Sequence, residues 1–200
     1  MSRTRVESFS DGVFTIAITL LVLTIGLPND YTRLSQELTD RWPSFAAYVV
    51  SFAIIAVMWL NHHSIFNHFE RIDRGLVYLN LLLLMTIAFL PYTTGVFGEA
   101  LRKGDGAQTA AVAYSATMAA NAIAWGAMWL YASSGRRLLV PGFPEERRGI
   151  ATVSFLGGGV VYVLTVAVAF VNAYACLAFH AALAVYYALD PLSRFASRTK

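Results

Sequence analysis

Long apolar runs alternate with short polar segments along the whole chain. A helix needs about 20 apolar residues to cross the roughly 30 Å hydrocarbon core of a bilayer. Six runs approach that length, at about 6–28, 43–63, 75–98, 107–132, 149–171 and 173–190. The pattern predicts an all-α membrane protein in which residues 1–200 form one domain of six transmembrane helices. The last two runs meet near Asn172, so we expect a tight hairpin there.

Basic residues stand at the ends of these runs and are distributed unevenly. With six crossings, eleven fall on one side and four on the other. Positive residues are retained on the cytoplasmic side of a membrane, so both termini are predicted to be cytoplasmic. The eleven are Arg3, Arg5, Arg71, Arg74, Arg136, Arg137, Arg147, Arg148, Arg194, Arg198 and Lys200; the four are Arg33, Arg41, Arg102 and Lys103.

The composition supports the membrane assignment. Charged residues make up 14% of the chain and hydrophobic residues 57%, whereas soluble domains carry about 25% charged residues. The sequence pI is about 9.1, but the basic residues form no cluster of the kind that binds nucleic acid. The single cysteine, Cys176, excludes an intrachain disulfide.

Polar residues of the first three runs are predicted to lie at one depth. The first helix starts at the cytoplasmic face, the second ends there and the third leaves from it. The set is Arg5, Ser10, Asp11, Trp59, His62, His63 and Asn80. Ionisable groups at membrane depth are costly and need an explanation. In a structural network, Asp11 would accept hydrogen bonds from Trp59 Nε1, an imidazole or Asn80, and Arg5 would compensate its charge. A proton-sensing site also fits. A metal site fits less well, because adjacent histidines point to different sides of a helix.

One face of the first helix carries an apolar stripe at helical spacing, with two threonines beside it. Either lipid or a pore could lie against such a face. The stripe is Gly12, Ile16, Leu20, Leu23 and Leu27, and the threonines are Thr15 and Thr19. The sequence has no carbonyl-filter motif. It also lacks a phosphate loop, a nucleophile elbow and a zinc-protease motif, so no enzyme is predicted.

The N-terminal segment carries the pattern Arg-x-x-x-Phe-Ser-Asp, from Arg5 through Phe9 and Ser10 to Asp11. This resembles the first helix of the transmembrane protein 175 family, the endosomal and lysosomal potassium channels and their bacterial relatives. Later matching segments are Trp59-Leu-Asn-His62-His63-Ser-Ile-Phe66, Asn80-Leu-Leu-Leu-Leu and Phe89-Leu90-Pro91.

The resemblance implies a six-helix unit whose first helix lines a central pore. A chain with one unit is similar to bacterial members that form homotetramers. It also implies a constriction at Ile16, Thr19, Leu20 and Leu23, with Gly12, Thr15 and Leu27 as further pore-facing positions. Arg5, Phe9, Ser10, Asp11, Trp59, His62, His63 and Asn80 would then form a structural polar network. Thr24 departs from the pattern, because many relatives carry an acidic residue there.

The expected function is a potassium-preferring cation channel in the plasma (inner) membrane of a prokaryote. First-helix side chains would form a hydrophobic constriction in place of a carbonyl filter. The expected partners are further copies of the chain in a homotetramer, potassium ions and membrane lipid, without nucleic acid, a cofactor or any metal other than permeating potassium. The alternative is a proton-coupled secondary transporter using Asp11 and His62/His63; it would favour an inverted repeat, which the sequence does not show.

Overall fold

The computed structural model describes residues 2–189, and these residues confirm the all-α prediction. Their only extended pairing is an isolated bridge between Phe69 and Leu139. The α-helices are α1 (Arg3–Leu20), α2 (Leu34–Asp40), α3 (Trp42–Phe66), α4 (Arg74–Lys103), α5 (Ala107–Ser133), α6 (Glu145–Val171) and α7 (Ala173–Leu189). Three short 3₁₀ helices are η1 (Leu21–Ile25), η2 (Tyr31–Arg33) and η3 (Ser134–Arg136).

Local chemistry fixes the ends of the longest helix, α4. The Asp73 carboxylate accepts a hydrogen bond from the Leu76 backbone N–H at 2.9 Å, which satisfies one of the free donors of the first turn. At the other end, Gly104 adopts a left-handed φ of 80° and its N–H bonds to the Ala100 carbonyl. Glycine is suited to that conformation because it has no Cβ.

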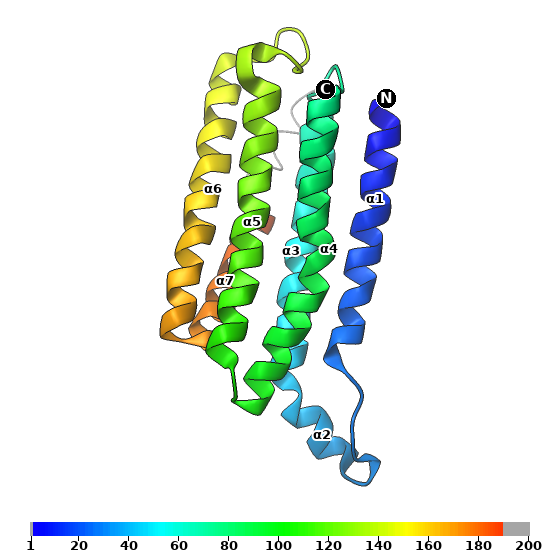
Figure 1. Cartoon of the computed structure of the whole chain (residues 1–200), viewed down its shortest axis with the longest axis vertical. Helices are drawn as coiled ribbons and strands as arrows, with labels where there is room; N and C mark the ends of the chain where they lie inside the picture. The colour runs from blue at the N-terminus through cyan, green and yellow to red at the C-terminus, as the bar shows by residue number, and fades with distance from the viewer. Residues whose placement is uncertain (1, 190–200) are drawn as a thin grey trace.

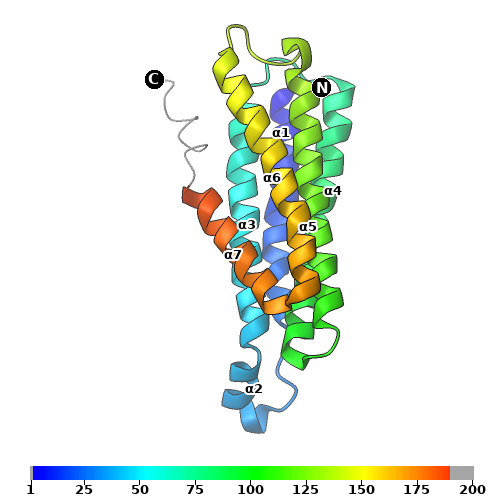
Figure 2. The ribbon, with the colours of Figure 1, turned by 90° about the vertical axis from the view of Figure 1, so that its left-hand side faces the viewer.

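The long helices stand side by side in a bundle (Figure 1). α1 packs against α3 and α4, and α5 packs against α4 and α6. α7 turns back from α6 at Asn172, whose backbone is extended, and slants between α6 and α3 (Figure 2). α1 therefore lies at one edge of the bundle and α6 at the other.

Four segments of the described chain are long and apolar enough to cross a membrane: Arg3–Ile25, Trp42–Phe66, Arg74–Lys103 and Glu145–Val171. The protein is therefore a multi-pass membrane protein. α7 is a shorter apolar helix, and α5 lies in the middle of the bundle with more than half of its residues buried. α5 and α7 are not among the four segments. A helix surrounded by protein can cross a membrane without being uniformly apolar, so six crossings remain a prediction.

The helices depart from the apolar runs at their ends. The first helix begins at Arg3, and α-helical geometry gives way to 3₁₀ geometry at Leu21. Gly26 then ends the segment with a φ of 71°. The polar stretch that follows contains η2 and α2. At the other end of the second run, α3 continues to Phe66, because Phe66 itself is fully buried in the core.

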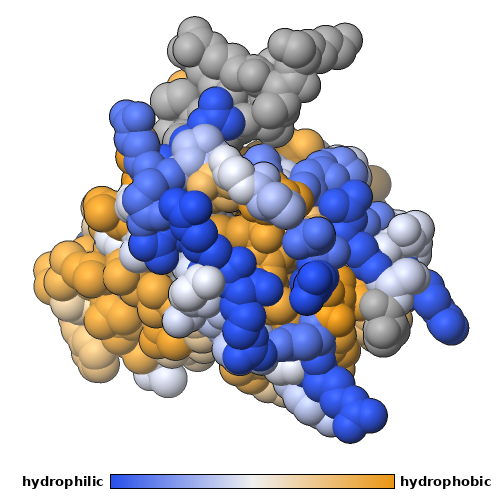
Figure 3. Space-filling view, turned by 90° about the horizontal axis from the view of Figure 1, so that it is seen from above, coloured by the Kyte–Doolittle hydropathy of each residue, from blue (hydrophilic) through white to orange (hydrophobic). Residues whose placement is uncertain are grey.

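Two loops form one layer at the end of the bundle that carries the N-terminus, the upper end in Figure 1. The Glu70 N–H donates to the Leu138 carbonyl at 2.9 Å, and the Val140 N–H donates to the His68 carbonyl at 3.0 Å. Seen from above, hydrophilic residues extend across this end with apolar surface between them (Figure 3). Arg194, Arg198 and Lys200 lie outside the described residues.

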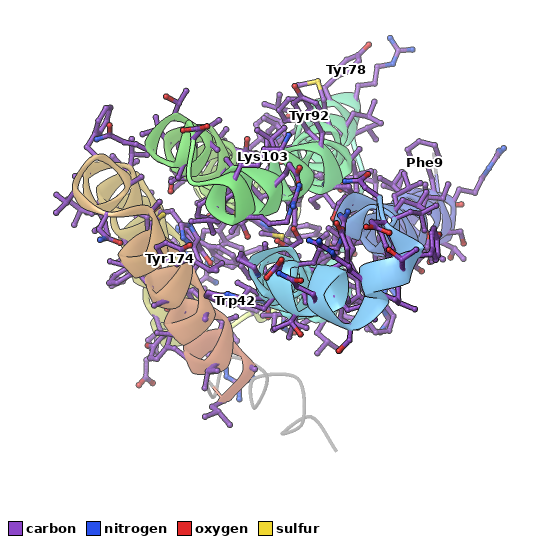
Figure 4. The ribbon with its side chains drawn as sticks, turned by 90° about the horizontal axis from the view of Figure 1, so that it is seen from below. Phe9, Trp42, Tyr78, Tyr92, Lys103 and Tyr174 are labelled. Atoms are coloured by element: carbon purple, nitrogen blue, oxygen red, sulfur yellow. The ribbon has the colours of Figure 1, made fainter. Side chains whose placement is uncertain are left out.

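Aromatic side chains surround the bundle at several heights. Phe9, Tyr78 and Tyr92 are exposed on the outer surface of α1 and α4 (Figure 4). Near the lower end, Trp42 stacks on Tyr174 with ring centroids 5.9 Å apart. This contact ties the start of α3 to the start of α7.

Candidate functional site

One face of α1 and η1 is uncovered and the opposite face is buried. Ile16 is 60% exposed and Leu23 is 73% exposed, whereas Phe14 and Leu21 are 2% and 0% exposed. The structure places four residues of the predicted stripe on the uncovered face, with the two threonines beside them. The four are Gly12, Ile16, Leu20 and Leu23, and the threonines are Thr15 and Thr19. The fifth stripe residue, Leu27, is also exposed, but it follows Gly26, which ends the helical segment.

The change to 3₁₀ geometry keeps the stripe aligned. Ile16 and Leu20 are four residues apart in an α-helix, which corresponds to about 6 Å along its axis. Leu20 and Leu23 are three residues apart across the start of η1, and three residues make one 3₁₀ turn of about 6 Å. The three apolar side chains therefore recur on one face at even intervals.

The two threonines of this face direct their hydroxyl protons to their own helix. Thr15 Oγ1 donates to the Asp11 carbonyl at 2.8 Å. Thr19 Oγ1 lies 3.0 Å from the Thr15 carbonyl and 2.9 Å from the Ile16 carbonyl. With the proton used in this way, the lone pairs of each hydroxyl oxygen remain available as acceptors.

A buried chain of polar side chains joins the opposite face of α1 to α3 and α4. Asn80 Nδ2 donates to Ser10 Oγ at 3.0 Å, and Asn80 Oδ1 lies 2.8 Å from His62 Nε2. Ser10 Oγ in turn donates to the Val6 carbonyl. All three side chains are almost fully buried. Because unsatisfied polar groups are costly inside a membrane, this chain fixes α1 relative to its neighbours.

Aromatic rings enclose the imidazole of His62. Phe66 stacks on it with centroids 4.3 Å apart, and Phe14 and Trp125 approach it edge-on at 5.4 and 6.0 Å. Phe14 belongs to the buried face of α1 and Trp125 to α5. His62 thus connects α1, the hydrogen-bonded chain and the centre of the bundle.

A second contact anchors α1 nearer the surface. Trp59 Nε1 donates to Asp11 Oδ1 at 2.9 Å, one of the partners that the sequence left open. Within the described residues, Asp11 and His62 share no hydrogen bond. The polar positions therefore form two anchors, one buried and one exposed.

Three residues of the predicted network lie outside both anchors. Arg5, Phe9 and His63 are exposed, and Arg5 has no ion pair with any residue from 2 to 189. We had expected Arg5 to compensate the charge of Asp11. The two are six residues apart on one helix, about 240° around its axis, so they face different sides.

Arg41 is a structural residue that sequence reasoning missed. Its side chain is buried, with Nη1 donating to the Ile25 carbonyl at 3.2 Å and Nη2 to the Leu27 carbonyl at 2.6 Å. A cation at a helix C-terminus satisfies carbonyls that have no partner in the helix. The only signal in the sequence is an isolated arginine immediately before the Trp42-Pro43 helix start.

The described residues contain no group of three or more His, Cys, Asp or Glu side chains arranged to hold a metal ion. Between Gly12 and Leu23, the side-chain oxygen atoms of the uncovered face are those of Thr15 and Thr19. Any ion on this face would meet hydroxyl oxygens and apolar side chains.

Comparison with known proteins gives these features a context. The family model described as "Endosomal/lysosomal potassium channel TMEM175" matches residues 5–91, which contain both anchors and the uncovered face. A protein from Streptomyces collinus named a potassium channel is 44% identical over 188 residues, covering 93% of this chain and 91% of its own. The chain belongs to the TMEM175 family.

Other TMEM175 proteins resemble the chain in structure and in part of the sequence. A crystal structure from Chamaesiphon minutus, titled a lysosomal potassium-selective channel TMEM175 homolog, matches with a TM-score of 0.84 at 36% identity. The match covers 94% of this chain and 96% of that one. The human endosomal/lysosomal proton channel TMEM175 is 39% identical over 101 residues, which are 46% of this chain and 20% of the human protein. TMEM175 is a family of ion channels, not of enzymes.

Proposed function

We propose that this protein is a potassium-preferring cation channel, formed by four copies of the chain around a pore lined by α1. Each subunit would cross the plasma membrane of a prokaryote six times, with both termini in the cytoplasm. The bacterial relatives named as potassium channels support the permeant ion. The uncovered face of α1 is the observation that carries the pore assignment.

The position of α1 in the bundle favours a central role. α1 packs on α3 and α4 and lies at the edge of the subunit opposite α6 (Figure 1). Neighbouring apolar side chains on α4 are also exposed, among them Leu82, Met85 and Phe89. A helix edge of this kind is what a subunit would present to its neighbours around an axis.

A pore along this face would have a hydrophobic constriction at Ile16. Four isoleucine side chains that meet on an axis can exclude water and so close the path to ions. Below it, Leu20 and Leu23 would form further rings at about 6 Å intervals. Thr15 and Thr19 lie beside the stripe, and their hydroxyl oxygens would replace part of an ion's hydration when α1 rotates.

The alternative of a proton-coupled transporter finds no support in the polar anchors. A relay through Asp11 and a histidine needs these groups to exchange protons with each other or through a third group. Asp11 bonds to Trp59, and His62 bonds to Asn80. Both anchors instead fix α1 against its neighbours, one to α3 and α4 through buried side chains and the other to α3 near the surface, which suits a structural role beside a pore.

Single-channel recording in planar bilayers with unequal potassium and sodium tests the proposal. Ile16→Asn should let water enter the constriction, raising conductance and lowering the preference for potassium over sodium. Leu23→Asn should do the same to a smaller extent, because the α1 helices are expected to diverge beyond Ile16. The matched control is Leu164→Asn on α6, an exposed leucine at the opposite edge of the bundle.

A variant on the buried face of α1 tests whether the correct face was assigned to the pore. Leu21→Asn places an amide on the buried face and should lower the yield of folded protein without changing permeation. If Leu21→Asn changed the permeability ratio and Ile16→Asn did not, the wrong face was assigned to the pore. If neither changed it, α1 does not line the pore.

A further inference from the structure

The bundle contains an apolar groove on the side of α3 away from α1. It encloses a cavity of about 140 Å³ between α3, α5, α6 and α7. A dry cavity of about 150 Å³ lined by apolar side chains is large enough to hold a benzene-sized group. Its lining includes Met58, Trp125, Trp129, Phe155 and Tyr162.

The groove exists because α3 and α6 scarcely touch each other. α3 packs on α4, α1 and α7, while α6 packs on α5 and α7. α5 forms the floor, and Ala184 and Tyr187 of α7 also line the groove. Figure 2 shows α7 slanting across the bundle beside α3 and α6. Its α3 wall runs from Ile54 to Ile65 and continues to His68. The twelve helical residues from Ile54 to Ile65 measure about 18 Å, more than half of a roughly 30 Å hydrocarbon core.

Polar groups gather in the upper part of this otherwise apolar groove. Asn61, Ser64, His68 and Arg147 all line it. Within residues 2–189, the side chains of Asn61 and Ser64 have no hydrogen-bond partner. Both side chains are partly exposed in the groove, so their polar atoms are available to a polar ligand there.

Charge at the mouth favours an anion. Arg147 opens the α6 wall one turn before Ala151, at the level of the loop that carries His68. Burial, and then the nearby Arg147, holds the pKa of His68 below its usual range. His68 is therefore uncharged near neutral pH, and Arg147 supplies the positive charge at this mouth.

We propose that this groove binds an anionic phospholipid, with one acyl chain along the aromatic lining and the phosphate beside Arg147. The lipid would come from the leaflet next to the upper end. Its ester and phosphate oxygens would accept hydrogen bonds from Asn61 and Ser64. Arginine is well suited to phosphate because its guanidinium can donate two parallel hydrogen bonds.

The C-terminal tail is the competing occupant. It follows α7 directly and contains Leu192 and Phe195, which could enter an apolar groove. The tail also carries Arg194, Arg198 and Lys200 and only one acidic residue, Asp190. A basic segment would place like charges beside Arg147, so charge complementarity favours the lipid.

The site does not depend on the pore assignment. The groove is lined by α3, α5, α6 and α7 and by no residue of α1, and α1 packs on α3 and α4 at the other edge of the bundle. Around an α1-lined axis it would face the surrounding bilayer. In a subunit that formed no pore at all, the same groove would still be open to lipid.

Native mass spectrometry of the detergent-purified protein tests the proposal with two added probes, dioleoyl phosphatidylglycerol and dioleoyl phosphatidylcholine. We expect phosphatidylglycerol adducts in preference to phosphatidylcholine adducts. Arg147→Gln should weaken phosphatidylglycerol binding about tenfold, which corresponds to the loss of one charge-assisted contact. The control Arg71→Gln removes an exposed arginine of the same end that does not line the groove.

A second pair of variants tests the groove by its volume. Gly159 lines the groove and has no heavy atom within 4 Å of a Cβ built on it, so Gly159→Leu would fill the acyl-chain space. Gly157 is two residues away, exposed and outside the lining, and is equally open. Gly159→Leu should abolish the adducts and Gly157→Leu should retain them. The same spectra give the oligomeric mass, so misassembled variants are recognised.

Several results would overturn the lipid site. Equal binding of the two lipids would remove the role of Arg147, and equal adducts in the two glycine variants would place the lipid elsewhere. A chain truncated after Leu189 that binds lipid, beside a full chain that does not, would identify the tail as the occupant. Loss of a tetrameric mass with lipid binding retained would count against the channel assembly and leave the groove assignment standing.

Discussion

Single polar side chains decide how firmly α1 is held against the bundle. Ser10, Asn80 and His62 form a buried chain across three helices, and Asp11 adds a bond to Trp59 near the surface. Each bond contributes little by itself. Removing one partner from a buried bond leaves the other unsatisfied, which costs about 1–3 kcal/mol.

We expect His62→Phe to lower the unfolding temperature in detergent, because it keeps an aromatic ring between Phe14 and Phe66 and deletes the bond to Asn80. The destabilisation should be about 1–3 kcal/mol. His63→Phe is the matched control, since His63 is the next residue and is exposed. Equal unfolding temperatures for the two variants would mean that the buried bond contributes no net stability.

Asp73 makes stability depend on pH at the upper end. The Leu76 N–H, followed by Arg137 and Tyr131, stabilises its carboxylate and holds its pKa below the usual range. The stabilisation is therefore complete above the unfolded-state pKa of about 4 and is lost as pH falls through the lower folded-state value. Asp73→Asn retains a side-chain oxygen that can cap the helix but removes the negative charge at the N-terminus of α4. It should therefore unfold at a slightly lower temperature than the wild type at pH 7, by about 0.3–1 kcal/mol for the lost charge.

Unfolding temperatures measured at several pH values test whether the Asp73 carboxylate stabilises the protein only when it is ionised. As pH falls below about 4, the wild type should approach the Asp73→Asn variant in unfolding temperature. Asp105→Asn, an exposed change in the α4–α5 loop, serves as the control. A gap between wild type and Asp73→Asn that stays constant down to pH 3 would contradict an ionised cap.

The sequence placed the polar residues at one depth but could not pair them. Topology alone brings Asp11, Trp59 and Asn80 to the same level of the membrane. Which donor meets which acceptor depends on the rotation of each helix, and apolar runs carry little information about rotation. Arg5 illustrates this, because its expected contact with Asp11 fails on the angle between two positions of the same helix.

Among the elements, the end of α1 departs most from what its sequence suggested. An uninterrupted helix to residue 28 was expected, but η1 and Gly26 end it earlier. Arg41 explains how this end is held, since its guanidinium bonds to the Ile25 and Leu27 carbonyls. Arg41 is 16 positions from Ile25 and 14 from Leu27. Contacts over such distances do not alter the spacing of apolar residues, so the hydrophobic pattern cannot predict them. The spans were predictable because apolarity over 20 residues is itself the signal.

Arg41→Leu should loosen the lower end of α1 while leaving the apolar packing of α3 in place. We expect a lower unfolding temperature, by about 1–3 kcal/mol for carbonyls left without a partner. If α1 lines the pore, single-channel currents of the variant should also become noisier, with more frequent subconductance levels. Arg33→Leu, an exposed arginine of the preceding 3₁₀ helix, is the control. Identical stability and currents in both variants would show that Arg41 does not position α1.

The whole molecule divides into two halves with different surroundings. α1, α3 and α4 hold the anchors and the uncovered face, and α5, α6 and α7 add the groove. The sequence drew attention to the first half only, because its polar residues interrupt apolar runs. The groove escaped notice since its walls, α3 and α6, are separated by two helices in the chain and share no motif. Only the packing of α5 and α7 between them creates the space.

The separation of basic residues between the two ends predicts the orientation of the molecule. Arg3, Arg74 and Arg136 lie at the upper end, and Arg33 and Lys103 at the lower end (Figure 1). Because positive residues are retained in the cytoplasm, we expect the upper end, with the N-terminus, to lie inside the cell.

Cysteine labelling of intact cells tests this orientation in a Cys176→Ala background. Cys176 is buried beside Ser115, so its removal eliminates the remaining thiol without altering either end. A membrane-impermeant maleimide should label Asp105→Cys, in the lower loop, before lysis. Ser2→Cys and Ser134→Cys, both exposed at the upper end, should react only after the cells are opened. Labelling of Ser2→Cys in intact cells would reverse the orientation, and would move the phosphate end of the groove to the outer leaflet.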